Sequence, residues 1–243
     1  WSLNNNWSLN NDCSYQIFCN MAFYDVNNLD VGSRMGDFNG DGIQDFAFEK
    51  NYSNQGVNFF ITNSLGSINL DSSWSSPINF AHNSTRGPNY YQTPSGVMIG
   101  DVNGDGFVDI IQSKSGEQGV YINQFYFGHK NFILNGLVNI PAGTYTDFTQ
   151  GANLIDVNSD GLVDIFYRRD GASHVFMNTG SGFVEDTSSG WNTLAQYGDL
   201  INGSTQMVDV NGDGLIDMVV TTNGDRANAK ILINTGSGWN LFQ

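Results

Sequence analysis

Three aspartates recur at a fixed spacing inside a segment that otherwise reads as a buried β-strand. In MVDVNGDGLIDMVV, from Met207 to Val220, Asp209, Asp213 and Asp217 lie between apolar residues at both ends. Carboxylates this close repel one another, and burying them without a partner costs free energy. The spacing therefore predicts that a cation neutralises them.

The full pattern is D-x-N-x-D-G-x-x-D, and it occurs four times, in GDFNGDGIQDFAF, GDVNGDGFVDIIQ, IDVNSDGLVDIFY and VDVNGDGLIDMVV. Side-chain oxygens at positions one, three and five, the carbonyl at position seven and a bidentate carboxylate at position nine form an oxygen-only shell, which suits calcium better than magnesium. Glycine at position six permits the tight turn. An EF-hand shares the first six positions, but it closes with Glu at position twelve and is flanked by helices.

These positions define four predicted calcium sites. The side chains predicted to bind are Asp37, Asn39, Asp41 and Asp45; Asp101, Asn103, Asp105 and Asp109; Asp156, Asn158, Asp160 and Asp164; and Asp209, Asn211, Asp213 and Asp217. The predicted carbonyl ligands are those of Ile43, Phe107, Leu162 and Leu215. The third site has Ser159 where the others have glycine, so we expect it to bind calcium most weakly.

The acidity of the chain follows from these loops. The formal net charge is −15, and twelve of the 24 acidic residues lie in the four motifs, so removing them leaves −3. Without a basic surface to neutralise phosphates, the chain is not expected to bind nucleic acid. No apolar run approaches the roughly 18 residues of a membrane-spanning helix, so membrane insertion is not expected either.

The motifs also set the period of the fold. Their first aspartates are 64, 55 and 53 residues apart, a spacing typical of stacked supersecondary units. Short runs rich in Val, Ile and Phe follow each motif, bounded by Gly, Asn and Ser, which favours β-strands over helices. Four strands per unit predict an all-β propeller that forms a single domain over residues 1–243. We expect units at 33–94, 95–150, 151–203 and 204–243, with 1–32 as the end of a preceding unit or a closing strand.

The two ends of the chain have the same phase in the repeat. The chain finishes NTGSGWNLFQ and opens WSLNNNW, so that Trp1 corresponds to Phe183 and Trp239, and Trp7 corresponds to Trp191. This phase predicts either a four-blade ring closed by the N-terminal strand or part of a longer propeller. The opening has neither the basic start nor the apolar h-region of a signal peptide, as we expect of a mature, trimmed or excised chain.

The four motifs, followed by a strand and, in three units, by a Gly-rich turn, resemble the FG-GAP/VCBS repeats of calcium-binding β-propellers. Such blades occur in integrin α-subunits, in certain fungal lectins and in large bacterial surface proteins. The phrase NTGSGW at Asn234–Trp239, echoed at Asn178–Phe183, is also similar to propeller segments of Rhs/YD-repeat proteins and of B-type components of insecticidal toxin complexes. The resemblance implies the propeller fold and bound calcium, but no particular ligand. The chain departs from the family in unit two, which lacks the Gly-Ser-Gly turn, and in having four motifs where seven blades are common.

No catalytic arrangement is recognisable in the sequence. His82, His129 and His174 are isolated, no G-x-S-x-G nucleophile elbow is present, and the acidic residues outside the motifs form no evident pair. We therefore expect a non-enzymatic module that binds a protein or a carbohydrate, next to other domains of a larger chain. A structural propeller in a large secreted assembly is the alternative. Five aromatic residues between the units could stack on sugars or pack between blades, namely Tyr90, Tyr91, Tyr145, Trp191 and Tyr197.

The expected calcium sites favour a location outside the cell or on its surface, where calcium is abundant. Cys13 and Cys19, the only cysteines, could form a small-loop disulfide there or remain two thiols. Their spacing does not fit a CxxC metal or redox pair.

Overall fold

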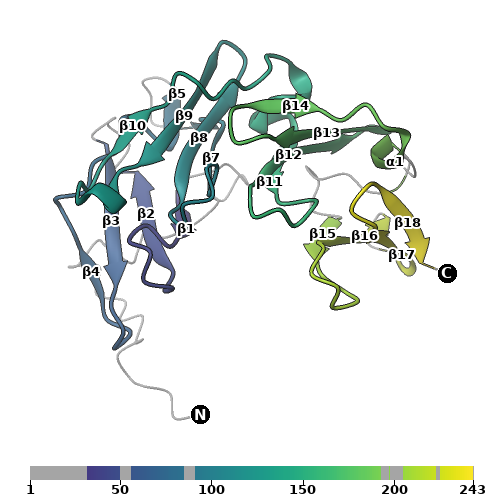
Figure 1. The fold of residues 1–243 in the computed structure, drawn as a ribbon, viewed down its shortest axis with the longest axis horizontal. Helices are drawn as coiled ribbons and strands as arrows, with labels where there is room; N and C mark the ends of the chain where they lie inside the picture. The colour runs from purple at the N-terminus through teal and green to yellow at the C-terminus, as the bar shows by residue number, and fades with distance from the viewer. Residues whose placement is uncertain are drawn as a thin grey trace.

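The computed structural model describes residues 32–49, 56–84, 91–192, 197, 205–222 and 225–242. Its strands form four antiparallel four-stranded sheets, here called blades 1 to 4, which follow one another in chain order around a common axis (Figure 1). The predicted all-β propeller is confirmed. The cysteines and the N-terminal segment, with the predicted closing strand, lie outside the described residues.

In every blade, strands that are consecutive in the chain are neighbours in the sheet, and each Asp-rich loop joins the first strand to the second. Blades 1 and 2 contain β1 (Arg34–Gly36), β2 (Asp45–Glu49), β3 (Val57–Thr62) and β4 (Ile68–Leu70), and then β7 (Val97–Gly100), β8 (Asp109–Lys114), β9 (Glu117–Asn123) and β10 (Phe132–Leu134). Blades 3 and 4 contain β11 (Ala152–Ile155), β12 (Asp164–Arg169), β13 (Ala172–Asn178) and β14 (Phe183–Glu185), and then β15 (Thr205–Val208), β16 (Asp217–Thr222), β17 (Asp225–Asn234) and β18 (Trp239–Phe242).

In the chain, blades 1 and 2 are separated by a two-stranded sheet that was not predicted from the sequence. It is formed by β5 (Ala81–Ser84) and β6 (Tyr91–Pro94). This insertion accounts for the first motif spacing of 64 residues, against 55 and 53 for the others. The helical segments of the described residues are short, namely η2 (Phe125–Phe127), η3 (Thr144–Thr146), η4 (Phe148–Gln150) and α1 (Ser189–Asn192). Within the described ranges, no helix has the length and apolar character needed to cross a membrane.

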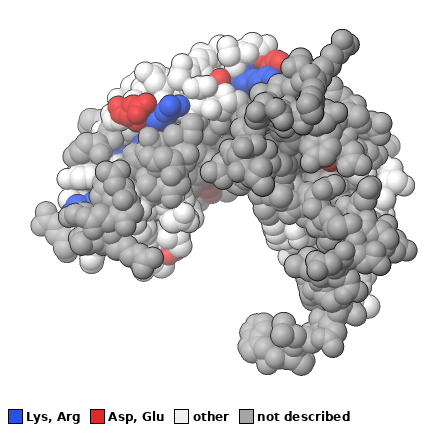
Figure 2. Space-filling view, turned by 180° about the vertical axis from the view of Figure 1, so that it is seen from behind, with Lys and Arg blue, Asp and Glu red and all other residues white. Residues whose placement is uncertain are grey.

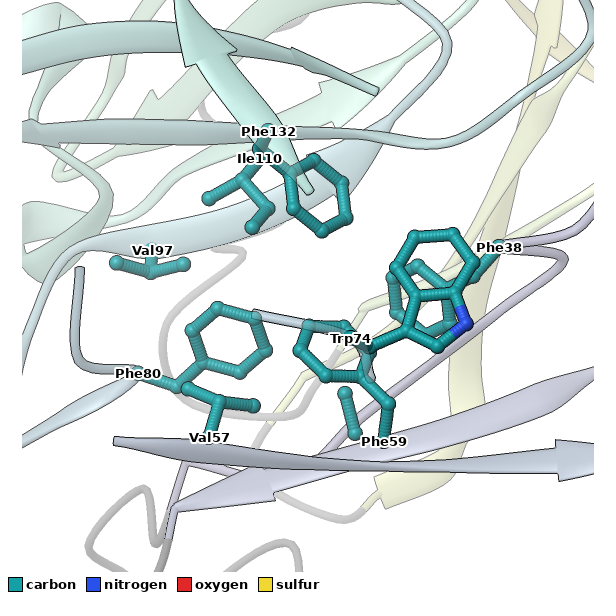
Figure 3. Packing of buried hydrophobic residues seen from close by; sticks show 9 residues of the cluster. Phe38, Val57, Phe59, Trp74, Phe80, Val97, Ile110 and Phe132 are labelled. Atoms are coloured by element: carbon teal, nitrogen blue, oxygen red, sulfur yellow. The ribbon is translucent and has the colours of Figure 1, made fainter. Parts of the chain in front are cut away.

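The hydrophobic core lies between consecutive blades. In β8, Ile110 packs into the cluster shared with blade 1 and Ile111 packs into the cluster shared with blade 3, because successive side chains of a strand point to opposite faces. Figure 3 shows Phe59 of blade 1 facing Ile110 and Phe132 of blade 2. A third cluster, around Leu232, joins blades 3 and 4. Blades 2 and 3, which lie between two neighbours, are therefore apolar on both faces. This explains why the sequences of their strands are nearly continuous hydrophobic runs.

The Asp-rich loops are part of these blade interfaces. The second residue of the motif is at most 1% exposed in blades 1 to 3, where the next blade covers it, whereas Val210 at this position in blade 4 is 44% exposed. Consecutive loops are also joined through the main chain, since the Val163 N–H of blade 3 donates to the Asp101 carbonyl oxygen of blade 2 at 3.2 Å. The loops consequently lie one beside another at the same end of the blades.

Candidate metal centres

Each Asp-rich loop is closed by hydrogen bonds from its own backbone to the first aspartate. In blade 1, Asp37 Oδ1 accepts from the N–H groups of Gly40 and Asp41 at 2.7 and 3.1 Å, and Asp37 Oδ2 accepts from Gly42 N–H at 2.7 Å. Gly42 has a φ of 82°, a left-handed conformation that glycine adopts without strain. Loop N–H groups also donate to the first aspartate of the other three motifs, Asp101, Asp156 and Asp209.

The third and fifth positions lie on the outer part of the loop. Asn39 Oδ1 accepts from Asp41 N–H at 3.0 Å, Asn39 Nδ2 donates to Asp41 Oδ2 at 3.1 Å, and Asp41 Oδ1 accepts from Ile43 N–H at 2.9 Å. The other three loops repeat all three contacts. The structure therefore brings positions one, three and five together in every motif.

The ninth aspartate is placed differently, because its side chain turns into the blade. All four residues at this position, Asp45, Asp109, Asp164 and Asp217, are fully buried. Asp109 Oδ2 accepts from Val102 N–H at 3.0 Å, and Asp109 Oδ1 accepts from Asn123 N–H at 2.8 Å. The same pair of bonds occurs in the other blades. This side chain thus joins the start of the loop to the end of the third strand, a structural contact that is separate from its predicted role as a metal ligand.

The donor chemistry of the loops fits a hard divalent cation. Every predicted ligand presents oxygen, and each motif contains three carboxylates whose mutual repulsion a divalent ion would offset. As the side chains of the described ranges are placed, no three Asp, Glu, His or Cys residues converge on one centre. The loop carboxylates instead accept from loop N–H groups, and the ninth faces the blade. Calcium binding therefore stays a prediction, based on the set of oxygen donors and on the turn that gathers them.

Burial raises the pKa of three of the ninth-position carboxyls. It raises the pKa of Asp109 to about 7, and the pKa values of Asp45 and Asp164 to about 6. Repulsion from the first and fifth carboxylates of the same loop, Asp101 and Asp105 in blade 2, adds to the rise, while the two backbone N–H donors oppose it by favouring the ionised form. A cation bound among the three carboxylates would lower these pKa values.

We expect the calcium-free protein to lose stability as the pH rises from about 4 to about 7. An unfolded aspartate has a pKa of about 3.9. Between that value and the raised folded pKa, the folded state binds more protons than the unfolded state, so a higher pH favours unfolding. The unfolding midpoint in excess chelator should be higher at pH 5 than at pH 8, and Asp109→Asn should weaken this dependence. A higher midpoint at pH 8 in chelator would contradict the raised pKa values.

Sequence reasoning missed an asparagine at the end of the third strand that ties consecutive blades together. Asn178 Nδ2 of blade 3 donates to the Val102 carbonyl oxygen of blade 2 at 2.8 Å, and to the Val163 carbonyl oxygen of its own blade at 3.2 Å. Asn123 and Asn234 make the equivalent contacts in blades 2 and 4. The repeated Asn of the N-T-G-S-G phrase is the available signal, but the phrase by itself indicates only a turn.

Ser159, the exception among the fourth-position glycines, also contacts the neighbouring blade. Its φ of 57° lies in the left-handed region, which is uncommon for a residue with a side chain. The hydroxyl donates to the Gly214 carbonyl oxygen in blade 4 at 2.7 Å. Serine therefore adds a hydrogen bond between blades 3 and 4, and the predicted weakness of its calcium site stays a prediction.

Of the three histidines, His129 and His174 have side chains that the structure describes. His174 Nδ1 and Glu185 Oε1 are 2.7 Å apart, and the imidazole stacks on the ring of Tyr145 with centroids 3.6 Å apart. His129 is exposed. His82 lies in β5, where the side chain is outside the described structure.

The aromatic residues singled out in the sequence have mixed placements. Trp191 is fully buried and packs edge-on against Trp239, with centroids 5.6 Å apart, so it serves packing between blades 3 and 4. Tyr197 packs against the same cluster. Tyr90 and the side chain of Tyr91 lie outside the described structure.

Comparison with known proteins supports the fold and one repeat. Residues 156–220 match the model of a family described as an FG-GAP-like repeat. A solved structure of an Agrocybe aegerita lectin that recognises non-reducing terminal N-acetylglucosamine matches with 20% identity and a TM-score of 0.58, over 86% of this chain and 50% of the lectin chain. A Photorhabdus luminescens Tc holotoxin pore matches with 18% identity and a TM-score of 0.54, over 90% of this chain and 10% of the toxin chain. No curated protein matches this chain.

The blades and loops define the class of the protein as an all-β propeller. Within that class the chain contains an FG-GAP-like repeat at residues 156–220, as the sequence resemblance implied. The chain spans half the length of the lectin chain and a tenth of the toxin chain. At 20% and 18% identity, these two structures support the fold alone.

Proposed function

We propose that this chain is a non-enzymatic, calcium-stabilised propeller that binds a carbohydrate or a protein partner outside the cell or on its surface. The observation that carries the proposal is the match of its blades to a lectin over 86% of this chain. Of the two kinds of partner we favour carbohydrate, because the matching lectin recognises a terminal sugar. The buried aspartates accept hydrogen bonds from backbone N–H groups, and this structural use supports a binding role over a catalytic one.

The proposed calcium ions occupy the four Asp-rich loops. The first, third and fifth side chains of each motif provide oxygens at one end of the blade, and the buried ninth carboxylate anchors the loop to the third strand. Extracellular calcium modules bind with a Kd of about 10⁻⁴–10⁻³ M. Loops of this affinity are filled outside the cell and empty in a cytosol with far less calcium, which supports the proposed extracellular location.

The charges of the chain, with 24 acidic against nine basic residues, disfavour an acidic partner. Where Figure 2 shows described residues, basic side chains lie beside acidic ones among uncharged residues. Two of the lysines are paired, since Lys114 Nζ lies 3.2 Å from Glu117 Oε2 and Lys130 Nζ lies 2.7 Å from Asp71 Oδ2. Such pairs leave little positive charge to attract an acidic ligand.

A second candidate is a structural role in a large secreted assembly. The toxin pore shares the fold over 90% of this chain, with a TM-score of 0.54. In such an assembly the blades would contact neighbouring protein surfaces and would recognise no free glycan.

A glycan array separates the two candidates. The labelled chain, applied in millimolar calcium, should bind a restricted set of glycans, and excess chelator should remove the signal because the loops at one end of the blades lose their cations. Absence of any glycan signal in calcium, with the fold verified by circular dichroism, would reject carbohydrate binding and favour the structural role.

A further inference from the structure

Three of the four Asp-rich loops contain an Asn-Gly dipeptide at the third and fourth positions of the motif. Asn39 stands before Gly40, Asn103 before Gly104 and Asn211 before Gly212. Attack of the glycine nitrogen on Cγ of the preceding asparagine closes a succinimide ring, because only the asparagine backbone carbon, Cα and Cβ lie between the two atoms. Glycine has no side chain to shield its nitrogen, and all three glycines are exposed.

The first aspartate of each of these loops accepts a hydrogen bond from the glycine nitrogen. Gly40 N–H donates to Asp37 Oδ1 at 2.7 Å, and the same bond has the same length in blades 2 and 4. A general base lies within about 2.6–3.2 Å of the group whose proton it removes. The carboxylate of Asp37 is therefore placed to take the proton of the attacking nitrogen.

The asparagine amide is polarised by a different part of the loop. Asn39 Oδ1 accepts from Asp41 N–H at 3.0 Å, and the equivalent bonds in blades 2 and 4 are 3.0 and 2.9 Å long. When a nitrogen attacks Cγ, negative charge develops on Oδ1, and a backbone donor about 2.7–3.1 Å away stabilises that charge. Each of the three loops thus places a nucleophile, a base and an oxyanion donor around one amide.

Blade 3 lacks this arrangement, although its motif is otherwise the same. Asn158 is followed by Ser159, whose side chain shields its nitrogen more than glycine would. Among the described residues, Asp156 accepts from the N–H groups of Asp160 and Gly161 but not from that of Ser159. The chain therefore contains its own comparison for the reaction.

We infer that Asn39, Asn103 and Asn211 are sites of self-catalysed deamidation, a chemistry that goes beyond the proposed binding function. In blade 1 the Gly40 nitrogen forms a bond to Cγ of Asn39, and its proton passes to the Asp37 carboxylate. The bond between Cγ and Nδ2 then breaks, Nδ2 takes up that proton, and ammonia leaves a succinimide. Water hydrolyses either carbonyl of the ring and yields aspartate or isoaspartate.

Deamidation changes a residue that is predicted to bind calcium. Aspartate at this position adds a negative charge to the three carboxylates of the motif and increases their repulsion. Isoaspartate also transfers a side-chain carbon into the main chain, which lengthens the turn that gathers the predicted ligands. Either product alters the loops of blades 1, 2 and 4 and leaves the loop of blade 3 unchanged.

The test incubates the wild-type chain at neutral pH in excess chelator and follows each asparagine by peptide mapping with mass spectrometry. Water enriched in heavy oxygen labels the hydrolysed ring, and fragmentation distinguishes aspartate from isoaspartate. The three loop asparagines should convert about tenfold or more faster than Asn135, as expected for general-base catalysis. Asn158 should stay an amide over the same period.

Asn135 is a matched control within the chain. It also precedes a glycine, and its Oδ1 accepts from Leu137 N–H at 2.9 Å, as the loop asparagines do from their own loops. Among the described residues, the Gly136 nitrogen donates to no carboxylate, so this dipeptide has the same sequence without the base.

Asp37→Asn removes the base from blade 1 and keeps the shape of the side chain. Conversion of Asn39 should fall to the rate of Asn135, while the loop asparagines of blades 2 and 4 keep their wild-type rates and so show that the variant is folded. A conversion of Asn39 that is no faster than that of Asn135 in the wild type, or that is unchanged in Asp37→Asn, would overturn the inference.

Ser159→Gly is the complementary variant, because it gives blade 3 the dipeptide of the other loops. Asn158 should then convert at a rate close to that of Asn39. An amide at Asn158 that stays intact in this variant would show that the arrangement of the loop does not drive the reaction.

Discussion

Excess chelator should lower the unfolding midpoint of this chain by roughly 10–25 °C relative to millimolar calcium. An ion that binds only the folded state stabilises it by RT ln(1 + [L]/Kd). If free calcium is about ten times Kd, each loop contributes roughly 1.4 kcal/mol, and four loops contribute roughly 6 kcal/mol. That sum rivals the whole stability of a typical domain, about 5–15 kcal/mol. Differential scanning fluorimetry in the two buffers measures the shift.

A single-loop variant provides the internal control for this prediction. Asp213→Ala removes one exposed carboxylate from the loop of blade 4 and should lower the midpoint in calcium by about a quarter of the chelator effect, because one of four sites is lost. In chelator the same substitution should change the unfolding midpoint little. No ion is lost there, and the loss of loop hydrogen bonds is offset by weaker repulsion among the carboxylates. An unfolding midpoint that does not change in chelator would show that the folded loops are stable without metal. The proposed extracellular location would then lose its support.

The second large effect is expected from Asp109→Ala, which should destabilise the protein by about 2–6 kcal/mol even without calcium. The carboxylate accepts from the N–H groups of Val102 and Asn123, and it is fully buried. Removing it leaves two buried donors without an acceptor, at about 1–3 kcal/mol each. Urea unfolding in chelator measures this structural part of its contribution.

Asp105→Ala is the matched control, because Asp105 belongs to the same motif and carries the same charge. Its side chain accepts hydrogen bonds from exposed groups of its own loop. Phe107 N–H donates to Asp105 Oδ1 at 3.0 Å, and Asn103 Nδ2 donates to Asp105 Oδ2 at 2.9 Å. In chelator this variant should lose less than about 1 kcal/mol, whereas in calcium both variants should also lose the ion of blade 2. Equal losses for Asp105→Ala and Asp109→Ala in chelator would mean that Asp109 has no structural role beyond the metal.

The spacing of the motif was sufficient to predict the blades. The positions of the aspartates, the glycine at position six and the apolar runs on either side are local features, so the order of strand, loop and strand could be derived residue by residue. The structure confirms that order in all four blades. The insertion of β5 and β6 was also visible in principle, since the first spacing exceeds the others by about ten residues, but no local pattern identified it as a hairpin.

Contacts between blades could not be predicted in the same way. Asn178 and the Val102 carbonyl oxygen are 76 positions apart in the chain, and only the stacking of blades brings them to 2.8 Å. The burial of the ninth aspartate was hidden for a related reason. The spacing of Asp164, for example, predicts a metal ligand, whereas its partner Asn178 N–H belongs to the third strand. Tyr126 lies in η2 and is exposed, whereas the missing Gly-Ser-Gly indicated only that this turn differs from the others.

Equilibrium dialysis against millimolar calcium, followed by metal analysis, tests the central claim most directly. The wild-type chain should retain about four calcium ions, and Asp213→Ala should retain about three. Magnesium at the same concentration should not displace them, because the predicted shell of six to seven oxygens suits the larger ion. Fewer than three ions in the wild type, or an unchanged count in Asp213→Ala, would contradict calcium binding by the four Asp-rich loops.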